Sequence, residues 1–282
     1  MGRAFGLLLG LIFGASGTLA DPARVVSMNL CTDQLAMMVA APGQLVSVSY
    51  IARDKRASAM ADDAMAYPVN HGLAEEIYLL KPDLVIAGSF STRATTDMLR
   101  RLGVPVVVFE PANSLEDVSA RLRQMGEVLG RTDTADALIA EYETRLNRLL
   151  PADDNRPRAA LYSANGYTSG HMSLAGQIVE AAGLYNIARD YGYDFSGTLP
   201  LELLALSDPD LLVGTRPYAR ASRSEDVLAH PVVHYFAARS RAGQMRDGDW
   251  VCGTPHVLRA VEALMSARED LQVGKNTKEV SQ

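Results

Sequence analysis

One stretch of the chain occurs twice at a constant spacing. Residues 75–86, EEIYLLKPDLVI, align with residues 202–213, ELLALSDPDLLV. The positions of Glu75 and Glu202 differ by an offset of 127, and those of Pro82 and Pro209 differ by the same offset. A repeat of nearly half the chain is too long for a solenoid unit, whose period is about 20–50 residues. The sequence therefore predicts two similar lobes.

Each copy of the repeat sits in a rhythm of short apolar strands and helices. In the first half, strands are expected at 24–28, 45–49, 84–88 and 104–109, with a helix that begins at Thr32 and Asp33 and further helices at 73–80 and 95–102. Residues 159–163 and 174–183 repeat the first strand and helix. Strands that alternate with helices are typical of parallel sheets. The predicted fold class is α/β, with two lobes of mainly parallel sheet.

A helical connector is predicted between the lobes. Ser114 and Asp117 form a capping pair, and apolar residues recur at helical spacing through 115–128 and again through 134–150. Such a connector is a semi-rigid strut, unlike a Gly/Ser linker. The expected domains are a lobe at 21–112, the connector at 113–150, a second lobe at 151–270 and a disordered tail at 271–282.

The first 20 residues read as a secretory signal. A positive start at Arg3 precedes the apolar run 4–14, and small residues end at Ala20. No cysteine stands at that cleavage point to carry a lipid anchor, so a free, exported protein is expected. The formal net charge of −6 and 21% of charged residues disfavour disorder and nucleic-acid binding. Cys31 and Cys252 form a disulfide or remain free, and the sequence leaves both open.

Ligands of parallel α/β sheets sit beyond the carboxyl ends of the strands, so the loops after the strands supply the candidate binding residues. These loops are rich in aromatic residues and arginines, which suits a bulky ligand with apolar faces and oxygen groups. Arg93 and Arg220 stand at the same offset of 127, which places both in equivalent loops. The candidates are Met28, Asn29, Tyr50, Arg53, Phe90, Arg93, Tyr162, Tyr167, Tyr193, Arg216, Tyr218, Arg220 and Trp250.

The chain resembles the periplasmic binding proteins of iron-siderophore, haem and vitamin B12 ABC importers. The resemblance covers nearly all of the chain after residue 20 and is most specific at 24–27, 75–86 and 200–213. It implies two Rossmann-like lobes joined by one long rigid helix, with the ligand in the cleft between them. It also implies that Glu75 and Glu202 enter arginine-lined sockets on the permease subunits in the inner membrane. A periplasmic monomer is expected, with no cofactor.

Within this resemblance, a ferric siderophore is the first expected ligand, with cobalamin or haem as the alternatives. Haem usually needs an axial His or Tyr, and a bare zinc or manganese site needs several converging ligands. His71, His171, His230, His234 and His256 share no obvious face, so no metal site is predicted. Phosphate-binding and nucleophile-elbow motifs are missing from residues 21–282. The remaining alternatives are an exported enzyme with Cys31 as nucleophile, and a sensory binding protein.

Overall fold

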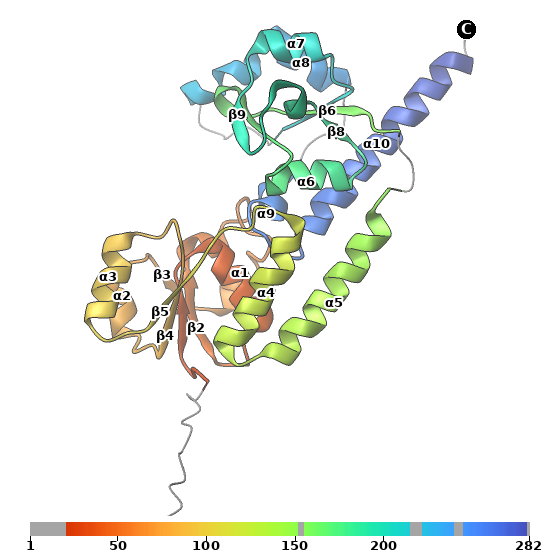
Figure 1. Cartoon of the computed structure of the whole chain (residues 1–282). Coiled ribbons are helices and arrows are strands. Elements are labelled where there is room, and N and C mark those ends of the chain that lie inside the picture. The colour runs from red at the N-terminus through yellow and green to blue at the C-terminus, as the bar shows by residue number, and fades with distance from the viewer. Residues whose placement is uncertain (1–20, 152–154, 215–221, 240–244, 281–282) are drawn as a thin grey trace, which may run out of the picture.

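The computed structural model describes residues 21–151, 155–214, 222–239 and 245–280, and the side chains of 272–280 are not described. The expected signal segment, residues 1–20, lies outside the described residues. Two α/β lobes lie at opposite ends of the molecule, and long helices connect them along one side (Figure 1).

The N-terminal lobe is built on a five-stranded parallel sheet with the strand order β3-β2-β1-β4-β5. Its central strands are fully buried, since Val25, Val26, Val85 and Ile86 expose no surface. The elements in order are β1 (Val25–Ser27), α1 (Leu30–Val39), β2 (Leu45–Ser49), β3 (Val69–Asn70), α2 (Ala74–Leu79), β4 (Leu84–Gly88), α3 (Arg93–Arg101) and β5 (Val106–Phe109).

The C-terminal lobe has a smaller parallel sheet with the order β10-β6-β8, and a two-stranded antiparallel ribbon of β7 and β9. The structure thus confirms the predicted α/β class with mainly parallel strands. The elements are β6 (Arg158–Leu161), β7 (Tyr167–Ser169), α6 (Leu174–Ala181), β8 (Tyr185–Asn186), β9 (Ser196–Thr198), α7 (Leu201–Ser207), β10 (Leu211–Val213), α8 (Pro231–Arg239), α9 (Asp247–Trp250) and α10 (Val257–Val280).

The sequence repeat is also a repeat of hydrogen bonds. In the first copy, Arg24 donates through Nη2 to the Leu80 carbonyl at 2.8 Å, and its backbone N–H donates to the Asp83 carboxylate. In the second copy, Arg158 donates through Nε to the Ser207 carbonyl at 3.3 Å, and its N–H donates to Asp210. The helix of each copy ends in a left-handed turn, at Lys81 (φ 49°) and Asp208 (φ 37°). Both lobes therefore fix the helix before the Pro-Asp turn in the same way.

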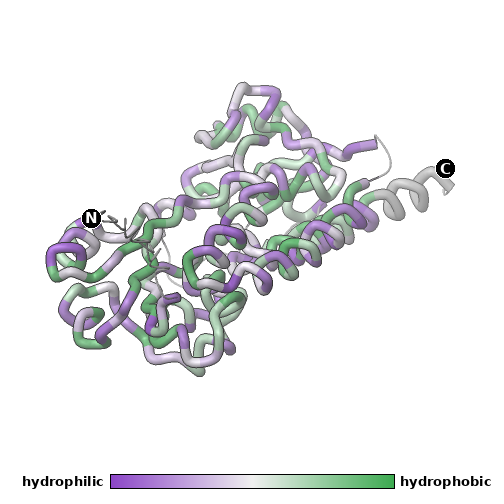
Figure 2. Tube along the Cα trace, turned by 60° about the horizontal axis from the view of Figure 1, so that its bottom comes forward, coloured by the Kyte–Doolittle hydropathy of each residue, from purple (hydrophilic) through white to green (hydrophobic). Residues whose placement is uncertain are grey.

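Two antiparallel helices form the connector, as the sequence predicts. Ser114 and Asp117 make the reciprocal capping box that starts α4 (Leu115–Leu129), and Gly130 ends it at φ 65°. Helix α5 (Thr132–Leu149) then runs to the second lobe, with α10 beside its far end (Figure 1). Hydrophilic and hydrophobic residues alternate around these helices (Figure 2), so that one face of each joins the core.

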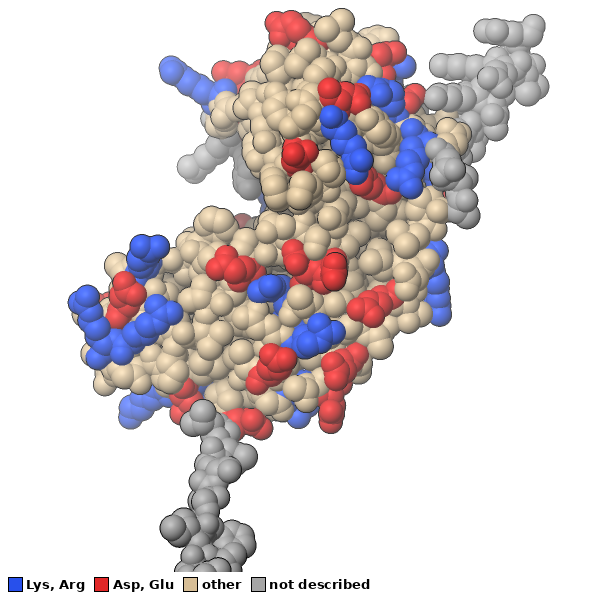
Figure 3. Space-filling model, in the orientation of Figure 1, with Lys and Arg blue, Asp and Glu red and all other residues tan. Residues whose placement is uncertain are grey.

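A single hydrophobic core passes from one lobe to the other. It includes Val25 and Phe109 of the first lobe, Tyr142 of α5, Ile178 of α6 and Val261 of α10. Each lobe also has a smaller core of its own. Despite the shared core, the surface is hollowed between the lobes on the side away from α5 (Figure 3).

Two local predictions are corrected. Helix α1 begins at Leu30 because the Asn29 side chain accepts from the Cys31 N–H at 3.0 Å, so Asn29 is the cap instead of Thr32 or Asp33. The expected disordered tail is wrong over 271–280, where α10 continues to Val280. The helix extends because Leu271 still packs on the core and no proline interrupts the segment.

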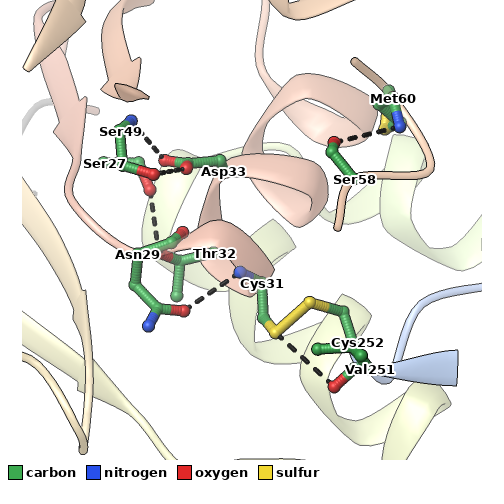
Figure 4. Close-up of a disulfide and its surroundings, with 10 residues drawn as sticks. All are labelled: Ser27, Asn29, Cys31, Thr32, Asp33, Ser49, Ser58, Met60, Val251 and Cys252. Atoms are coloured by element: carbon green, nitrogen blue, oxygen red, sulfur yellow. Dashed lines mark hydrogen bonds between the residues drawn. A yellow bond between two sulfur atoms is a disulfide. The ribbon is translucent and has the colours of Figure 1, made fainter. Parts of the chain in front are cut away.

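A disulfide joins Cys31 of the first lobe to Cys252, at a sequence separation of 221 (Figure 4). Beside it, Arg56 forms an ion pair with Asp247 at 2.8 Å, and Gly253 lies so close to Ala112 that a Cβ there would overlap it. The segment 247–256 of the second half is therefore fastened to the first lobe. The structure thus settles the disulfide question that the sequence leaves open.

Replacing both cysteines, Cys31→Ser with Cys252→Ser, should lower the free energy of unfolding by about 2–5 kcal/mol, because a long loop loses its closure. Urea unfolding of the oxidised protein and the double variant measures this. Added reductant should destabilise the parent protein and leave the variant unchanged. Equal unfolding midpoints for the oxidised parent and the variant would contradict the prediction.

The carboxyl group of Asp33 is buried and accepts from the backbone N–H and the hydroxyl of Ser49 at the end of β2. Burial raises its pKa from 3.8 to about 6, and hydrogen bonds from Ser49 and Ser27 offset part of the rise. Between pH 4 and 6 the unfolded chain has lost this proton while the folded chain retains it. Ionisation of Asp33 therefore lowers the stability of the fold as the pH rises through that window.

Asp33→Asn should remove the loss of stability that ionisation of Asp33 causes. The free energy of unfolding of the variant, relative to that of the parent, should therefore rise by up to about 3 kcal/mol from pH 4 to pH 7. Urea unfolding at several pH values measures the difference. Burial and the charge of Arg259 lower the pKa of His256 to about 4, so its effect on stability has the opposite pH dependence. This effect cancels in the comparison, because the parent and the variant both contain His256. A difference that does not change with pH would exclude the buried carboxyl as its source.

Candidate functional site

The first wall of the site lies where the N-terminal sheet changes direction. Strands β1 and β4 are neighbours, and the chain leaves them toward opposite edges of the sheet. The loops after such a pair diverge and leave a crevice between them. Asn29 follows β1, and Ser89 and Phe90 follow β4. The Asn29 side chain lies against Gly88, where a Cβ would come within 2.8 Å of it, so a larger residue at 88 would displace the cap.

A cavity of about 250 Å³ occupies this crevice. Phe90 stands at its mouth with 88% of its surface exposed, and Phe109 is buried in its wall. Arg121, on helix α4, supplies the cationic group of the lining and donates to Gln124 at 2.7 Å. The other lining residues are Asn29, Cys31, Thr32, Leu35, Gly88, Ser89, Glu110, Pro111, Ala112, Val251 and Gly253.

The second wall lies at the equivalent place in the C-terminal lobe. Tyr162 and Ser163 follow β6, Gly214 follows the adjacent strand β10, and Trp250 closes the pocket that they form. Burial, and then the negative charge of Glu202, raise the pKa of the Tyr162 hydroxyl, so this group stays protonated. The other lining residues are Leu161, Tyr167, Ser169, Ala175, Val213 and Met245.

The two pockets meet at helix α9. Trp250 lines the pocket of the second lobe and its neighbour Val251 lines that of the first. The disulfide at Cys252 holds this junction against the first lobe. The two walls therefore belong to one cleft between the lobes, which the space-filling view shows as the hollow of Figure 3.

Five of the predicted ligand-binding residues line this cleft: Asn29, Phe90, Tyr162, Tyr167 and Trp250. Asn29 has a structural role as well, because its side chain caps α1. Tyr162 is almost fully buried. Phe90 and Tyr167 are the exposed aromatic residues of the set. Within the described residues the indole N–H of Trp250 is buried without an acceptor, so Trp250 offers the cleft its ring and not its N–H.

Other predicted residues do structural work instead. Met28 is buried in the core of the first lobe. Arg53 donates to the carbonyls of Ala64 and Tyr67, which holds its guanidinium within its own loop. Tyr193 packs on Gly197 and donates to the Thr198 carbonyl at 2.8 Å.

Tyr50 and Arg93 are surface residues outside both pockets. Tyr50 stacks on His71 with ring centroids 5.4 Å apart, and Arg93 is exposed at the start of α3. Arg216, Tyr218 and Arg220 lie outside the described residues. Their expected roles in ligand binding stay predictions.

Sequence reasoning missed the lining residues that are not in loops after strands. Arg121 lies in the connector, which the sequence analysis treats only as a strut, and Val251 reaches the first lobe through the disulfide. One signal for Arg121 is present in the sequence. It is a charged residue directly before Leu122, which is fully buried, in a helix that packs beside α1.

The structure does not support Cys31 as a nucleophile, because its sulfur is in the disulfide and cannot form a thiolate. His256, a histidine that could serve such a nucleophile as base, lines a separate pocket between α1, α5 and α10. In the described part of the chain, no three His, Cys, Asp or Glu residues come together as a metal site. Over the same residues, no helix is long and apolar enough to cross a membrane.

The two glutamates of the repeat occupy equivalent places outside the cleft. Glu75 is exposed in the first turn of α2, and Glu202 is exposed in the first turn of α7. Neither carboxylate has a cation within ion-pair distance among the described residues. Within that part of the chain, no side chain neutralises either charge.

Residues 25–242 match the sequence pattern of a known family, described as periplasmic binding protein. The chain belongs to the periplasmic binding protein family. This membership confirms the resemblance noted in the sequence, and the matched residues include both walls of the cleft except Met245 and the lining residues of 250–253. It also confirms that the chain is similar to substrate-binding transport proteins.

Two curated relatives show how far the similarity extends. A cobalamin-binding protein of Halobacterium salinarum is 29% identical over 75% of this chain, and the chain spans 59% of that relative's length. A vitamin B12-binding protein of Pectobacterium carotovorum is 25% identical, and the match covers 96% of both chains.

Solved structures show the same two-lobe fold. A periplasmic heme-binding protein from Roseiflexus superposes with a TM-score of 0.70 at 20% identity, over 86% of this chain and 98% of that one. The periplasmic vitamin B12 binding protein of Vibrio cholerae gives a TM-score of 0.64 at 17% identity, over 89% and 98%. At these identities the likeness confirms the fold of this family member and says nothing of its ligand.

Proposed function

We propose that this protein captures a corrinoid of the cobalamin class in its cleft and delivers it to an ABC importer. The observation that carries the proposal is the lining of the cleft. Phe90 and Phe109 on one wall, and Tyr162, Tyr167 and Trp250 on the other, offer aromatic surface on both sides. A broad, largely apolar macrocycle with amide groups at its edge fits such walls. The two curated relatives described above are named for the same ligand class.

A corrinoid also suits the polar groups of the cleft. Its amide carbonyls and phosphate can accept from the Arg121 guanidinium, and its metal arrives with its own ligands. The protein then needs no metal ligand at all. The described cleft offers polar contacts only at a few points, which is how a pocket fixes the orientation of a mainly apolar ligand.

A ferric siderophore, the first ligand expected from the sequence, becomes the second candidate. That expectation relied on arginines around an anionic complex. Arg53 is engaged by backbone carbonyls, and Arg93 lies outside both pockets, which leaves Arg121 as the arginine of the described lining. Arg216 and Arg220 lie outside the described residues, so the order of the two candidates rests on the aromatic walls of the cleft and not on a count of its cations.

Haem is a third candidate because of one residue. No histidine lines either cleft pocket within the described residues, so an axial ligand for iron would have to be a tyrosine. Tyr167 is about half exposed in the cleft and could take that place, whereas Tyr162 is buried. Tyr167→Phe therefore distinguishes the two macrocycles: it should abolish a tyrosinate–iron charge-transfer band of haem and leave corrinoid affinity nearly unchanged.

The expected setting is the periplasm, where the protein would act as a monomer. We propose that Glu75 and Glu202 pair with arginines on the two permease subunits. Two carboxylates held at fixed places on one rigid body set the orientation of a two-fold partner and speed its association. Removing both should leave ligand affinity unchanged, because neither lines the cleft pockets.

Cyanocobalamin, haemin, neutral ferrichrome and an anionic ferric tris-catecholate should be compared by thermal shift and by the emission of Trp250, the only tryptophan. Cyanocobalamin should raise the melting temperature and quench the emission, since a ligand that binds the folded state stabilises it. Phe90→Ala should weaken its binding about tenfold through lost apolar contact. Phe195→Ala is the matched control, because Phe195 is exposed and lines neither cleft pocket.

Stabilisation by either ferric complex or by haemin, with none by cyanocobalamin, would contradict the corrinoid assignment and leave the family membership intact. Equal losses in Phe90→Ala and Phe195→Ala would place the ligand outside this cleft.

A further inference from the structure

The helices that carry the two glutamates also carry two exposed leucines. Leu79, in the last turn of α2, exposes 78% of its surface, and Leu206, in the last turn of α7, exposes 79%. Leu79 and Leu206 stand at the same offset of 127 as the two glutamates. Lone exposed leucines are common and need no explanation. Two at equivalent positions, exposed to the same degree, are not accounted for by chance exposure alone.

Leu79 and Leu206 differ in this respect from the other exposed apolar residues near the two helices. The exposed Leu73 and Tyr78 of the first lobe correspond in the repeat to Pro200 and Ala205, so these apolar surfaces occur in one lobe only. Packing inside each lobe is provided by the fully buried pair Ile77 and Leu204 on the opposite face of the helices. The exposed pair therefore has no role in holding its own lobe together.

Each leucine shares a helix face with the glutamate four residues before it. Residues four apart on a helix lie one above the other, so Glu75 with Leu79, and Glu202 with Leu206, form a charged and an apolar contact side by side. We define these two pairs as the docking pairs. In both lobes the C-terminal end of the helix is held by an arginine on its last carbonyls, Arg24 on Leu80 and Arg158 on Ser207. The docking pairs are thus presented on anchored helices.

We propose that Leu79 and Leu206 enter apolar sockets beside the arginines of the permease, one on each of its two equivalent subunits. This inference rests on the proposed role as an importer component. The argument for the partner is the duplication itself. A surface that offers the same acidic and apolar pair twice, at the outer ends of two lobes (Figure 1), fits a partner that offers the complementary surface twice.

The two halves of each pair should act on different steps of association. Exposed carboxylates steer the encounter, so their effect falls as salt rises. A leucine buried on contact adds apolar area that is unaffected by salt and mainly slows dissociation. The glutamates would then guide the protein to the permease, and the leucines would hold it there.

The test is binding of the full-length mature protein to the ABC importer of its own organism in lipid nanodiscs, measured by biolayer interferometry from about 50 to about 500 mM salt. Leu79→Ala with Leu206→Ala should speed dissociation about a hundredfold, about tenfold for each leucine. The salt dependence of association should stay that of the parent. Glu75→Ala with Glu202→Ala should slow association and flatten its salt dependence.

Leu150→Ala is the matched control, since Leu150 is exposed at the end of the connector, away from both helices. Thermal unfolding and ligand affinity should be unchanged in every variant. Parent-like dissociation of the leucine variant, with loss of binding in the glutamate variant, would overturn the leucine inference and leave the importer role standing. Failure of the parent protein itself to bind the importer would overturn both. A parent dimer that the leucine variant converts to monomer, with importer binding unchanged, would assign the leucines to self-association instead.

Discussion

The attachment of the segment 247–256 to the first lobe is the constraint on which the rest of the structure depends. This segment belongs to the second half of the chain, yet the disulfide at Cys252 and the Arg56–Asp247 ion pair fasten it to the first. The lobes are therefore connected at two places, once through α5 and once through this segment, from which α10 returns to the second lobe. Two connections and one continuous core resist a hinge motion far better than a single helix does.

The cleft follows from that constraint. Each lobe alone offers a shallow crevice at the point where its strands diverge, and neither crevice encloses much of a ligand. The fixed junction at Trp250 and Val251 places the two crevices face to face and contributes a residue to each. The same rigidity matters for the docking pairs, because a partner that contacts both lobes at once needs a constant distance between the two pairs.

The parts of the fold that repeat or obey local rules could be predicted from the sequence. The offset of 127 between Glu75 and Glu202 gave the two lobes, and the Ser114–Asp117 pair gave the start of α4. Phe90 and Tyr167 could be predicted as cleft residues because they follow strands, and the loops after parallel strands lie at one edge of the sheet. Which way a side chain turns within such a loop depends on its neighbours, so Met28 turned into the core and Arg53 onto backbone carbonyls. Arg121 and Val251 depend on contacts between distant segments, which no local pattern records.

The distance between the lobes with and without ligand is the most direct test of this account. Spin labels at Met98→Cys on α3 and Ala205→Cys on α7, both exposed, would report it by double electron–electron resonance. For a rigid body with a pre-organised site, the distance distributions of the free and the ligand-bound protein should agree within about 2 Å. A clear shortening on ligand binding, of the size seen in hinge closure, would contradict the rigid, doubly connected body from which the cleft and the docking surface were derived.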